Sequence, residues 1–172
     1  MNILYELGVY GPIILILFTW YLLWNNNNLF FYYTVGIFTN SIINLILKGI
    51  LQMPRPLFDS KNIKLATMHT KEQFYSNGIP FNIFGMPSGH AQSSFFSTVF
   101  IYLSTKHNNT VYLYLASTLL TCYQRYSSNY HSLLQLIAGA IIGSAFGYFV
   151  YQLAMDKIKG RIRERPDDNA PI

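Results

Sequence analysis

The sequence predicts an all-α fold, a polytopic membrane helix bundle of about five transmembrane helices with a functional site at one membrane face. Two observations predict it. Of the 172 residues, 51% are hydrophobic and only 11% are charged, whereas soluble domains average about 25% charged residues. In addition, five apolar stretches approach the length that a membrane-spanning helix needs, which is about 20 residues.

The first two helices are predicted at about 8–24 and 29–53, separated by a polar turn, "NNNN" (25–28). The second helix should end at the prolines of "MPRP" (53–56), because proline and the residue before it disfavour helix. Residues 54–86 then form the one long connection of the chain, whose role the sequence does not indicate.

Three further helices are predicted at about 87–105, 109–124 and 131–154. The last one contains a glycine at every fourth position, at Gly139, Gly143 and Gly147. Small residues at this spacing let a neighbouring helix approach closely in lipid, so we interpret them as packing positions.

The chain is predicted to form one transmembrane domain, 1–155, followed by a basic, partly disordered tail, 156–172. Five of the twelve basic residues lie in this tail. The net charge of +5 is therefore typical of a juxtamembrane segment, and no nucleic-acid partner is expected. The single cysteine, Cys122, excludes an intrachain disulfide framework and a CxxC metal site.

Polar residues near membrane level mark one side of the predicted bundle. With five crossings, the end of the second helix, the start of the third, the end of the fourth and the start of the fifth share a membrane face. The polar residues that stand out fall at these four places: Lys48, Arg55, Ser88, His90, Arg125, His131 and Gln135. Polar groups are costly at a membrane, so their convergence predicts a functional site.

The local spacing of these residues suggests phosphoryl chemistry. Lys48 and Arg55 are seven residues apart and would share a helix face if the helix continues that far. His131 and Gln135 are four apart, also on one face. "PSGH" (87–90) opens a helix, whose N-terminus attracts anions, and Gly89 allows close approach of the backbone. Two cations fit a phosphate, and two histidines fit a nucleophile and a general acid.

The distribution of acidic residues argues against a metal. The seven acids are Glu6, Asp59, Glu72, Asp156, Glu164, Asp167 and Asp168, and no two of them cluster near the histidines. A magnesium or two-metal site normally needs carboxylate ligands. We therefore expect metal-independent chemistry without a cofactor.

Three motifs in order resemble the type 2 phosphatidic acid phosphatase (PAP2) superfamily, whose pattern is K-x6-RP, PSGH and SR-x5-H-x3-D. The chain has "KGILQMPRP" (48–56), "PSGH" (87–90) and "QRYSSNYHSLLQ" (124–135). The first two match fully. In the third, Gln124 replaces the serine and Gln135 replaces the aspartate.

The resemblance implies a role for each matching residue. His131 would attack phosphorus and form a phosphohistidine, and His90 would protonate the leaving group. The phosphate-binding residues would be Lys48, Arg55, Ser88, the Gly89 backbone and Arg125. Gln135 would fix the tautomer of His131. Dolichyl diphosphate phosphatases, a branch of the superfamily, are similar around "GMPSGHAQ" (85–92) and also carry glutamine at this position of the third motif.

The leading hypothesis is an integral membrane phosphatase that converts a polyprenyl (dolichyl-type) diphosphate to the monophosphate carrier of glycan assembly. Its partners would be the bilayer and the lipid phosphate substrate. Two alternatives stay open: a general lipid phosphate phosphatase of the phosphatidate type, and a catalytically silent membrane protein that binds lipid phosphates. The sequence does not indicate an oligomeric state.

The basic tail also predicts a topology. Cations cluster on the cytoplasmic side of membrane proteins, so the C-terminus is expected to be cytoplasmic and the site lumenal or exoplasmic. The resemblance implies the endoplasmic reticulum, or the plasma membrane in a bacterium. "NNT" (108–110), an N-glycosylation acceptor pattern, would then lie on the cytoplasmic side.

Overall fold

The computed structural model describes residues 3–56, 84–105 and 107–159, which form a bundle of five helices. These are α1 (Ile3–Leu23), α2 (Asn27–Leu51), α5 (Gly89–Ser104), α6 (Asn108–Ser127) and α7 (Leu133–Lys159). Within the described ranges there is no strand beyond an isolated bridge between Pro54 and Phe84. The predicted all-α membrane bundle is confirmed.

Among the described residues, three helices are long and apolar enough to cross a membrane: Ile3–Leu23, Asn27–Leu51 and the stretch Leu133–Asp156 of α7. Their outer faces carry exposed aliphatic and aromatic side chains, as expected for surfaces in contact with lipid.

Helix α5 lies in the interior and contacts each of the other four helices. It is shorter and less apolar than the three candidate spans, but two of its hydroxyl groups bond to neighbouring helices. Ser97 bonds the Tyr33 hydroxyl of α2 at 2.7 Å, and Thr98 bonds Thr118 of α6 at 2.8 Å. Such bonds join helices where apolar burial against lipid gives little driving force.

The glycine series of α7 packs against a neighbouring helix, as predicted from its spacing, and that helix is α5. A Cβ atom at Gly139, Gly143 or Gly147 would meet backbone atoms of α5, at Ser88, Gln92 and Phe96 respectively. The glycines therefore allow α5 and α7 to pack backbone against backbone, and they have no chemical role.

The predicted helix boundaries were wrong by a few residues in several places. α1 begins at Ile3 instead of 8, because Gly8 lies inside the helix, packed against Gln124 of α6. α2 begins at Asn27, inside the predicted turn, because the Asn26 side chain caps it by accepting from the Leu29 N–H at 3.2 Å.

The later helices differ in the same way. α6 continues to Ser127, and α7 continues to Lys159, beyond both its predicted end at 154 and the predicted domain boundary at 155. The tail from 160 on and most of the 54–86 connection, residues 57–83, lie outside the described residues.

The end of α2 matters for the site. Gln52 adopts a left-handed conformation with φ of 45° and donates its N–H to the Lys48 carbonyl at 3.0 Å. The helix therefore stops at Leu51, and Arg55 follows in extended chain. Lys48 and Arg55 would share a helix face only if the helix continued to Arg55, and it does not, because α2 ends at Leu51 as the prolines predicted.

Candidate active site

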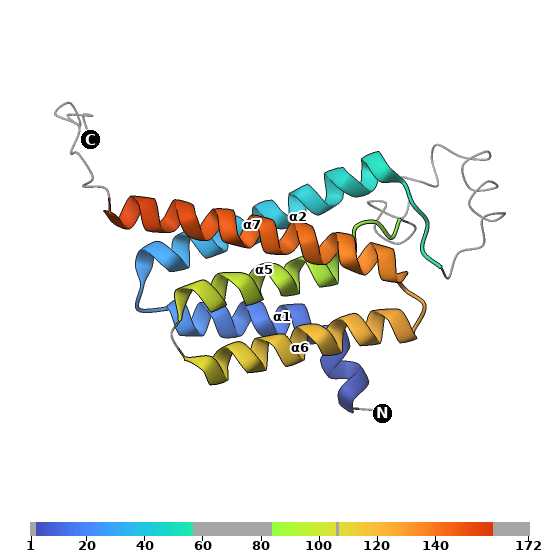
Figure 1. Ribbon diagram of the computed structural model, residues 1–172, viewed down its shortest axis with the longest axis horizontal. Helices are drawn as coiled ribbons and strands as arrows, with labels where there is room; N and C mark the ends of the chain where they lie inside the picture. Colours follow the sequence, from blue (N-terminus) through green and yellow to red (C-terminus); the bar gives the residue numbers. More distant parts are fainter. Residues whose placement is uncertain (1–2, 57–83, 106, 160–172) are drawn as a thin grey trace, which may run out of the picture.

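The four helix ends predicted to meet do meet at one end of the bundle (Figure 1). They enclose a cavity of about 610 Å³. Its polar lining consists of predicted site residues and several others: Lys48, Arg55, Gly89, His90, Arg125, His131, Ser41, Asn44, Ser93 and Tyr130. Lys48 and His131, which are 83 positions apart in sequence, are thereby brought to one place.

Ser88 and Gln135 were predicted for the site but do not line this cavity. Ser88 is fully buried and caps α5, where its hydroxyl accepts from the Ala91 N–H at 3.5 Å. Gln135 lies behind His131, away from the cavity. Both residues hold site segments in place.

His131 lies in the short connection between α6 and α7, and only 2% of its surface is exposed. Its Nδ1 donates to Gln135 Oε1 at 3.2 Å, which leaves Nε2 with the lone pair. Burial and the nearby Arg55 guanidinium lower the pKa of His131 to about 4. The imidazole is therefore neutral at pH 7, as a nucleophile must be.

The Gln135 carboxamide has one orientation that satisfies its surroundings. Its Nε2 donates to the Pro54 carbonyl at 2.8 Å, so its oxygen must face His131. The same oxygen accepts from the Ser132 N–H at 3.2 Å. Because a carbonyl can only accept, an ionised aspartate or glutamate, which has no donor, could not make the bond to Pro54.

Gln135 also joins the three motif segments. Its side chain holds Pro54 of the first segment and His131 of the third, and its backbone carbonyl accepts from the Ser88 N–H of the second at 3.0 Å. Gly85 lies directly against the carboxamide, where a Cβ would collide with it. The sequence predicted only the contact with His131, because the other contacts are long-range.

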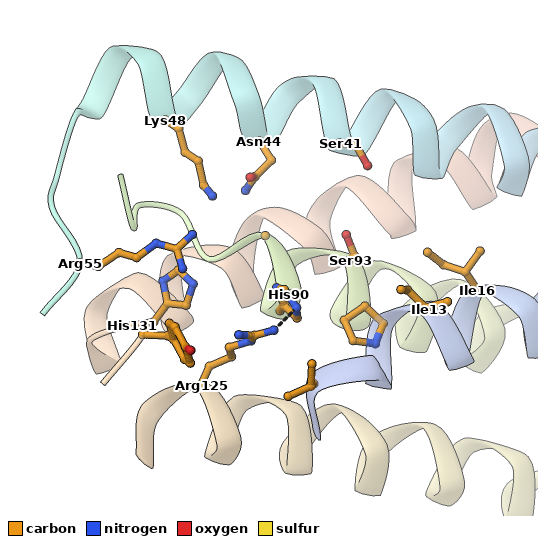
Figure 2. A pocket seen from close by; sticks show the side chains of 14 residues that line it. Ile13, Ile16, Ser41, Asn44, Lys48, Arg55, His90, Ser93, Arg125 and His131 are labelled. Carbon is orange, nitrogen blue, oxygen red and sulfur yellow. Dashed lines mark hydrogen bonds between the residues drawn. The ribbon is translucent and has the colours of Figure 1, made fainter. Parts of the chain in front are cut away.

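His90 extends from the first turn of α5 toward Arg125 of α6 (Figure 2). The Arg125 Nη2 group contacts His90 Nε2. A guanidinium has no acceptor, so His90 Nε2 accepts and carries no proton in this arrangement. Arg125 also stacks over the Tyr130 ring, with 5.2 Å between its Cζ atom and the ring centroid, which adds a cation–π contact.

Lys48 and Arg55 approach the cavity from α2 and the chain after it, and Arg55 lies beside His131 (Figure 2). Burial and Arg125 lower the pKa of Arg55 from its usual value, yet a guanidinium stays charged at neutral pH. Three cations face one cavity whose described lining contains no acid. This electrostatic arrangement favours an anion with several oxygen atoms.

Asn44 and Tyr130 are two of the lining residues that were missed from the sequence. Asn44 lies one turn before Lys48 and donates to the Pro87 carbonyl at 3.2 Å and to Gln92 Oε1 at 2.8 Å, which ties α2 to the start of α5. Its i, i+4 spacing to Lys48 was the available signal. Tyr130 had no such signal, because its contact with Arg125 depends on the fold of the turn after α6.

Gln124, the other departure from the family pattern, does not line the cavity. Its side chain is 2% exposed, donates to the Ser128 hydroxyl at 3.2 Å and packs against Gly8 of α1. Its replacement of serine therefore alters the contact between α6 and α1 and leaves the lining of the cavity unchanged.

Comparison with known proteins places the motifs in a family. A model of the PAP2 superfamily matches residues 29–159. Lipid phosphate phosphatase epsilon 2, chloroplastic, of Arabidopsis thaliana is 30% identical over 125 residues, which are 68% of this chain and 37% of the relative. The epsilon 1 counterpart from the same plant is 31% identical over 127 residues, which are 69% of this chain and 38% of that relative. The chain thus spans less than two fifths of these relatives' length. No solved structure is significantly similar to it.

Proposed function

The chain belongs to the PAP2 superfamily, and we propose that it is an integral membrane lipid phosphatase that hydrolyses a polyprenyl (dolichyl-type) diphosphate to the monophosphate. One observation carries the proposal. Two histidines and three cations from four chain segments, namely His90, His131, Lys48, Arg55 and Arg125, line a single cavity at the end of a membrane bundle.

The three cations would hold the terminal phosphate, together with backbone N–H groups at the start of α5. Arg55 and Arg125 offer planar donor pairs, and Lys48 adds a point charge. The positive end of the α5 dipole and those N–H groups of its first turn that Ser88 does not cap favour the same anion.

His131 would be the nucleophile. Its Nε2 lone pair attacks the terminal phosphorus while Nδ1–H stays bonded to Gln135 Oε1. The bond between phosphorus and the bridging oxygen breaks, and the lipid monophosphate leaves after that oxygen accepts a proton from His90. Water then attacks the phosphohistidine and gives its proton to His90, which releases phosphate and restores both histidines.

His90 must carry a proton for the first step, whereas in the structure its Nε2 faces the Arg125 guanidinium. The oxygens of a bound phosphate compete for that guanidinium. Binding of substrate would therefore turn Arg125 toward the phosphate and leave His90 Nε2 able to take a proton. This links formation of the general acid to occupancy of the site.

The diphosphate assignment rests on motif detail. "GMPSGHAQ" (85–92) and Gln135 are similar to dolichyl diphosphate phosphatases. The similarity to the Arabidopsis lipid phosphate phosphatases favours a second candidate, a general lipid phosphate phosphatase. A silent lipid-phosphate-binding protein is the third.

Phosphate release from dolichyl diphosphate and from phosphatidate separates these candidates. We would use purified protein in detergent with excess EDTA, and His131→Ala as the inactive control. We expect release that survives EDTA, disappears in the variant and favours the diphosphate. Equal or faster turnover of phosphatidate would establish the general phosphatase. No release from either lipid, by protein shown to be folded, would support the silent binder.

We also propose that the site is lumenal or exoplasmic and the C-terminus cytoplasmic, in the endoplasmic reticulum or, in a bacterium, the plasma membrane. Asn108 opens α6 at the opposite end of the bundle from the site, within the "NNT" pattern. A glycan on Asn108 in a eukaryotic host would refute this topology.

A further inference from the structure

The site cavity does not end at its polar residues. It continues along the bundle to an apolar wall formed by one helix, α1, with Val9, Pro12, Ile13 and Ile16 (Figure 2). The opposite side of this part of the cavity is α2, at Ser41 and Asn44, with Ser93 of α5 as the floor. A phosphate site alone would not need such a wall.

The two helices that flank this region are joined at the other end of the bundle. There the Trp20 indole N–H of α1 donates to the Thr34 hydroxyl of α2 at 3.1 Å. The ring centroids of Trp20 and Phe30 are 6.5 Å apart. Beyond this contact α1 packs mainly on α6, where Gly8 and Gly11 allow close approach. The cavity lies between α1 and α2 where they separate.

The cavity also reaches the outer surface of the bundle. Ile13 lines it and is nevertheless 55% exposed, and Ser41 across from it is exposed as well. Both helices are candidate membrane spans, so this surface faces hydrocarbon. An apolar path therefore leads from the cations of the site to the lipid.

We propose that this space between α1 and α2, the α1–α2 slot, holds the first carbons of the polyprenyl chain of the substrate. The inference rests on the proposed function. The phosphate at Lys48 and His90 fixes the head of the lipid, and the chain must then run toward hydrocarbon. The slot is the apolar continuation of that same cavity.

The slot makes α1 a determinant of specificity. α1 ends at Leu23, before the family match begins at residue 29, so the wall formed by Ile13 and Ile16 lies outside the matched region. The catalytic residues all lie inside it. The family chemistry and the choice of lipid chain are thus assigned to different parts of this chain.

Ile13 and its neighbour Ile14 offer a matched pair for a test. Both are exposed isoleucines of α1, at 55% and 41%, but Ile14 lies in a separate shallow depression with Leu7 and Tyr10. We would replace each in turn by the photoreactive residue p-benzoylphenylalanine, in the full chain in detergent. The probe is an alkyne-tagged polyprenyl monophosphate.

Cross-linking at position 13 should be competed by excess untagged polyprenyl phosphate and much less by phosphatidate or inorganic phosphate. Cross-linking at position 14 should be uncompeted. Competition at both positions or at neither would overturn the proposal, and equal competition by phosphatidate would refute its choice of chain. This binding readout does not depend on turnover, so absent phosphate release by wild type would refute the proposed function separately.

A second measurement uses hydrolysis. Ile13→Trp should fill the slot and raise KM for the long-chain diphosphate by at least about tenfold, the scale set by misfit of a few methylene groups in a pocket. KM for the short, water-soluble isopentenyl diphosphate should change much less, and Ile14→Trp should resemble wild type. An equal loss for both substrates in Ile13→Trp would contradict the slot.

Discussion

Replacing Gln135 by Glu should shift the acid limb of the pH–activity profile. In the wild type, burial and Arg55 hold the pKa of His131 at about 4. Below that pH His131, the proposed nucleophile, is protonated and cannot attack. We therefore expect kcat/KM, which reports on the free enzyme, to fall only near pH 4. Gln135→Glu places a carboxylate where Oε1 now lies, 3.2 Å from His131 Nδ1.

The size of the shift follows from that distance. Two unit charges about 4 Å apart interact by about 4 kcal/mol at an effective dielectric constant of about 20. At about 1.4 kcal/mol per pKa unit, this corresponds to about three units. Desolvation of the new carboxylate reduces the gain, so we expect the pKa of His131 to rise by at least about one unit.

The lost donor provides a second effect of Gln135→Glu. The Pro54 carbonyl, now bonded at 2.8 Å, would face a carboxylate oxygen, and the segment that carries Arg55 would move away. KM for the lipid should therefore rise. Gln135→Met is the matched control, because it removes the same bonds without adding charge. It should lower kcat by at least about 10²-fold, the usual scale of a lost general acid–base arrangement, with the acid limb still near pH 4.

The assay is phosphate release from polyprenyl diphosphate in detergent between pH 2.5 and 8, with folding checked at each pH by size-exclusion chromatography. An acid limb in Gln135→Glu that coincides with that of wild type would refute the contact between Gln135 and His131. A rise of the acid limb in Gln135→Met would show that the charge is not its cause.

Two further predictions concern packing and phosphate binding. Gly143→Ala should lower the thermal unfolding temperature, because its Cβ would meet the Gln92 backbone and overpacking costs about 1–3 kcal/mol. Gly49→Ala is the control, because its Cβ meets nothing within 4 Å, and it should leave the unfolding temperature unchanged or raise it. Equal effects of the two variants would contradict the backbone contact of α5 and α7. Tyr130→Leu should raise KM about threefold to tenfold through loss of the cation–π contact with Arg125, whereas Tyr130→Phe keeps the ring and should match wild type; parallel losses in both variants would assign the effect to the hydroxyl.

Much of the fold could be predicted because it depends on local properties. Apolar length specified the number of helices, and glycine spacing specified the face of α7 that packs on α5. The boundaries were less accurate, because they depend on contacts that composition does not report. Gly8 lies inside α1 at a position where Gln124 leaves no room for a side chain. α2 starts early because Asn26 caps it.

The candidate site was predictable to the extent that topology is. Alternating crossings of a membrane bring alternate helix ends together, so the convergence of Lys48, His90, Arg125 and His131 followed from counting helices. The relative placement of Lys48 and Arg55 could not be predicted in this way, because α2 ends at Leu51, with Gln52 as its cap, before Arg55 is reached.

Four properties were readable from the residues alone: the five helices of the described ranges, their apolar character, the shared end of the bundle and the residue types available for phosphoryl chemistry. Two others needed the folded bundle: one carboxamide, Gln135, joins all three motif segments, and α1 supplies an apolar wall beside the site. The difference lies in the range of the interactions. Hydropathy and helix periodicity act over a few residues, whereas these contacts join groups as far apart as Pro54 and Gln135, whose distance in space depends on how the whole bundle packs.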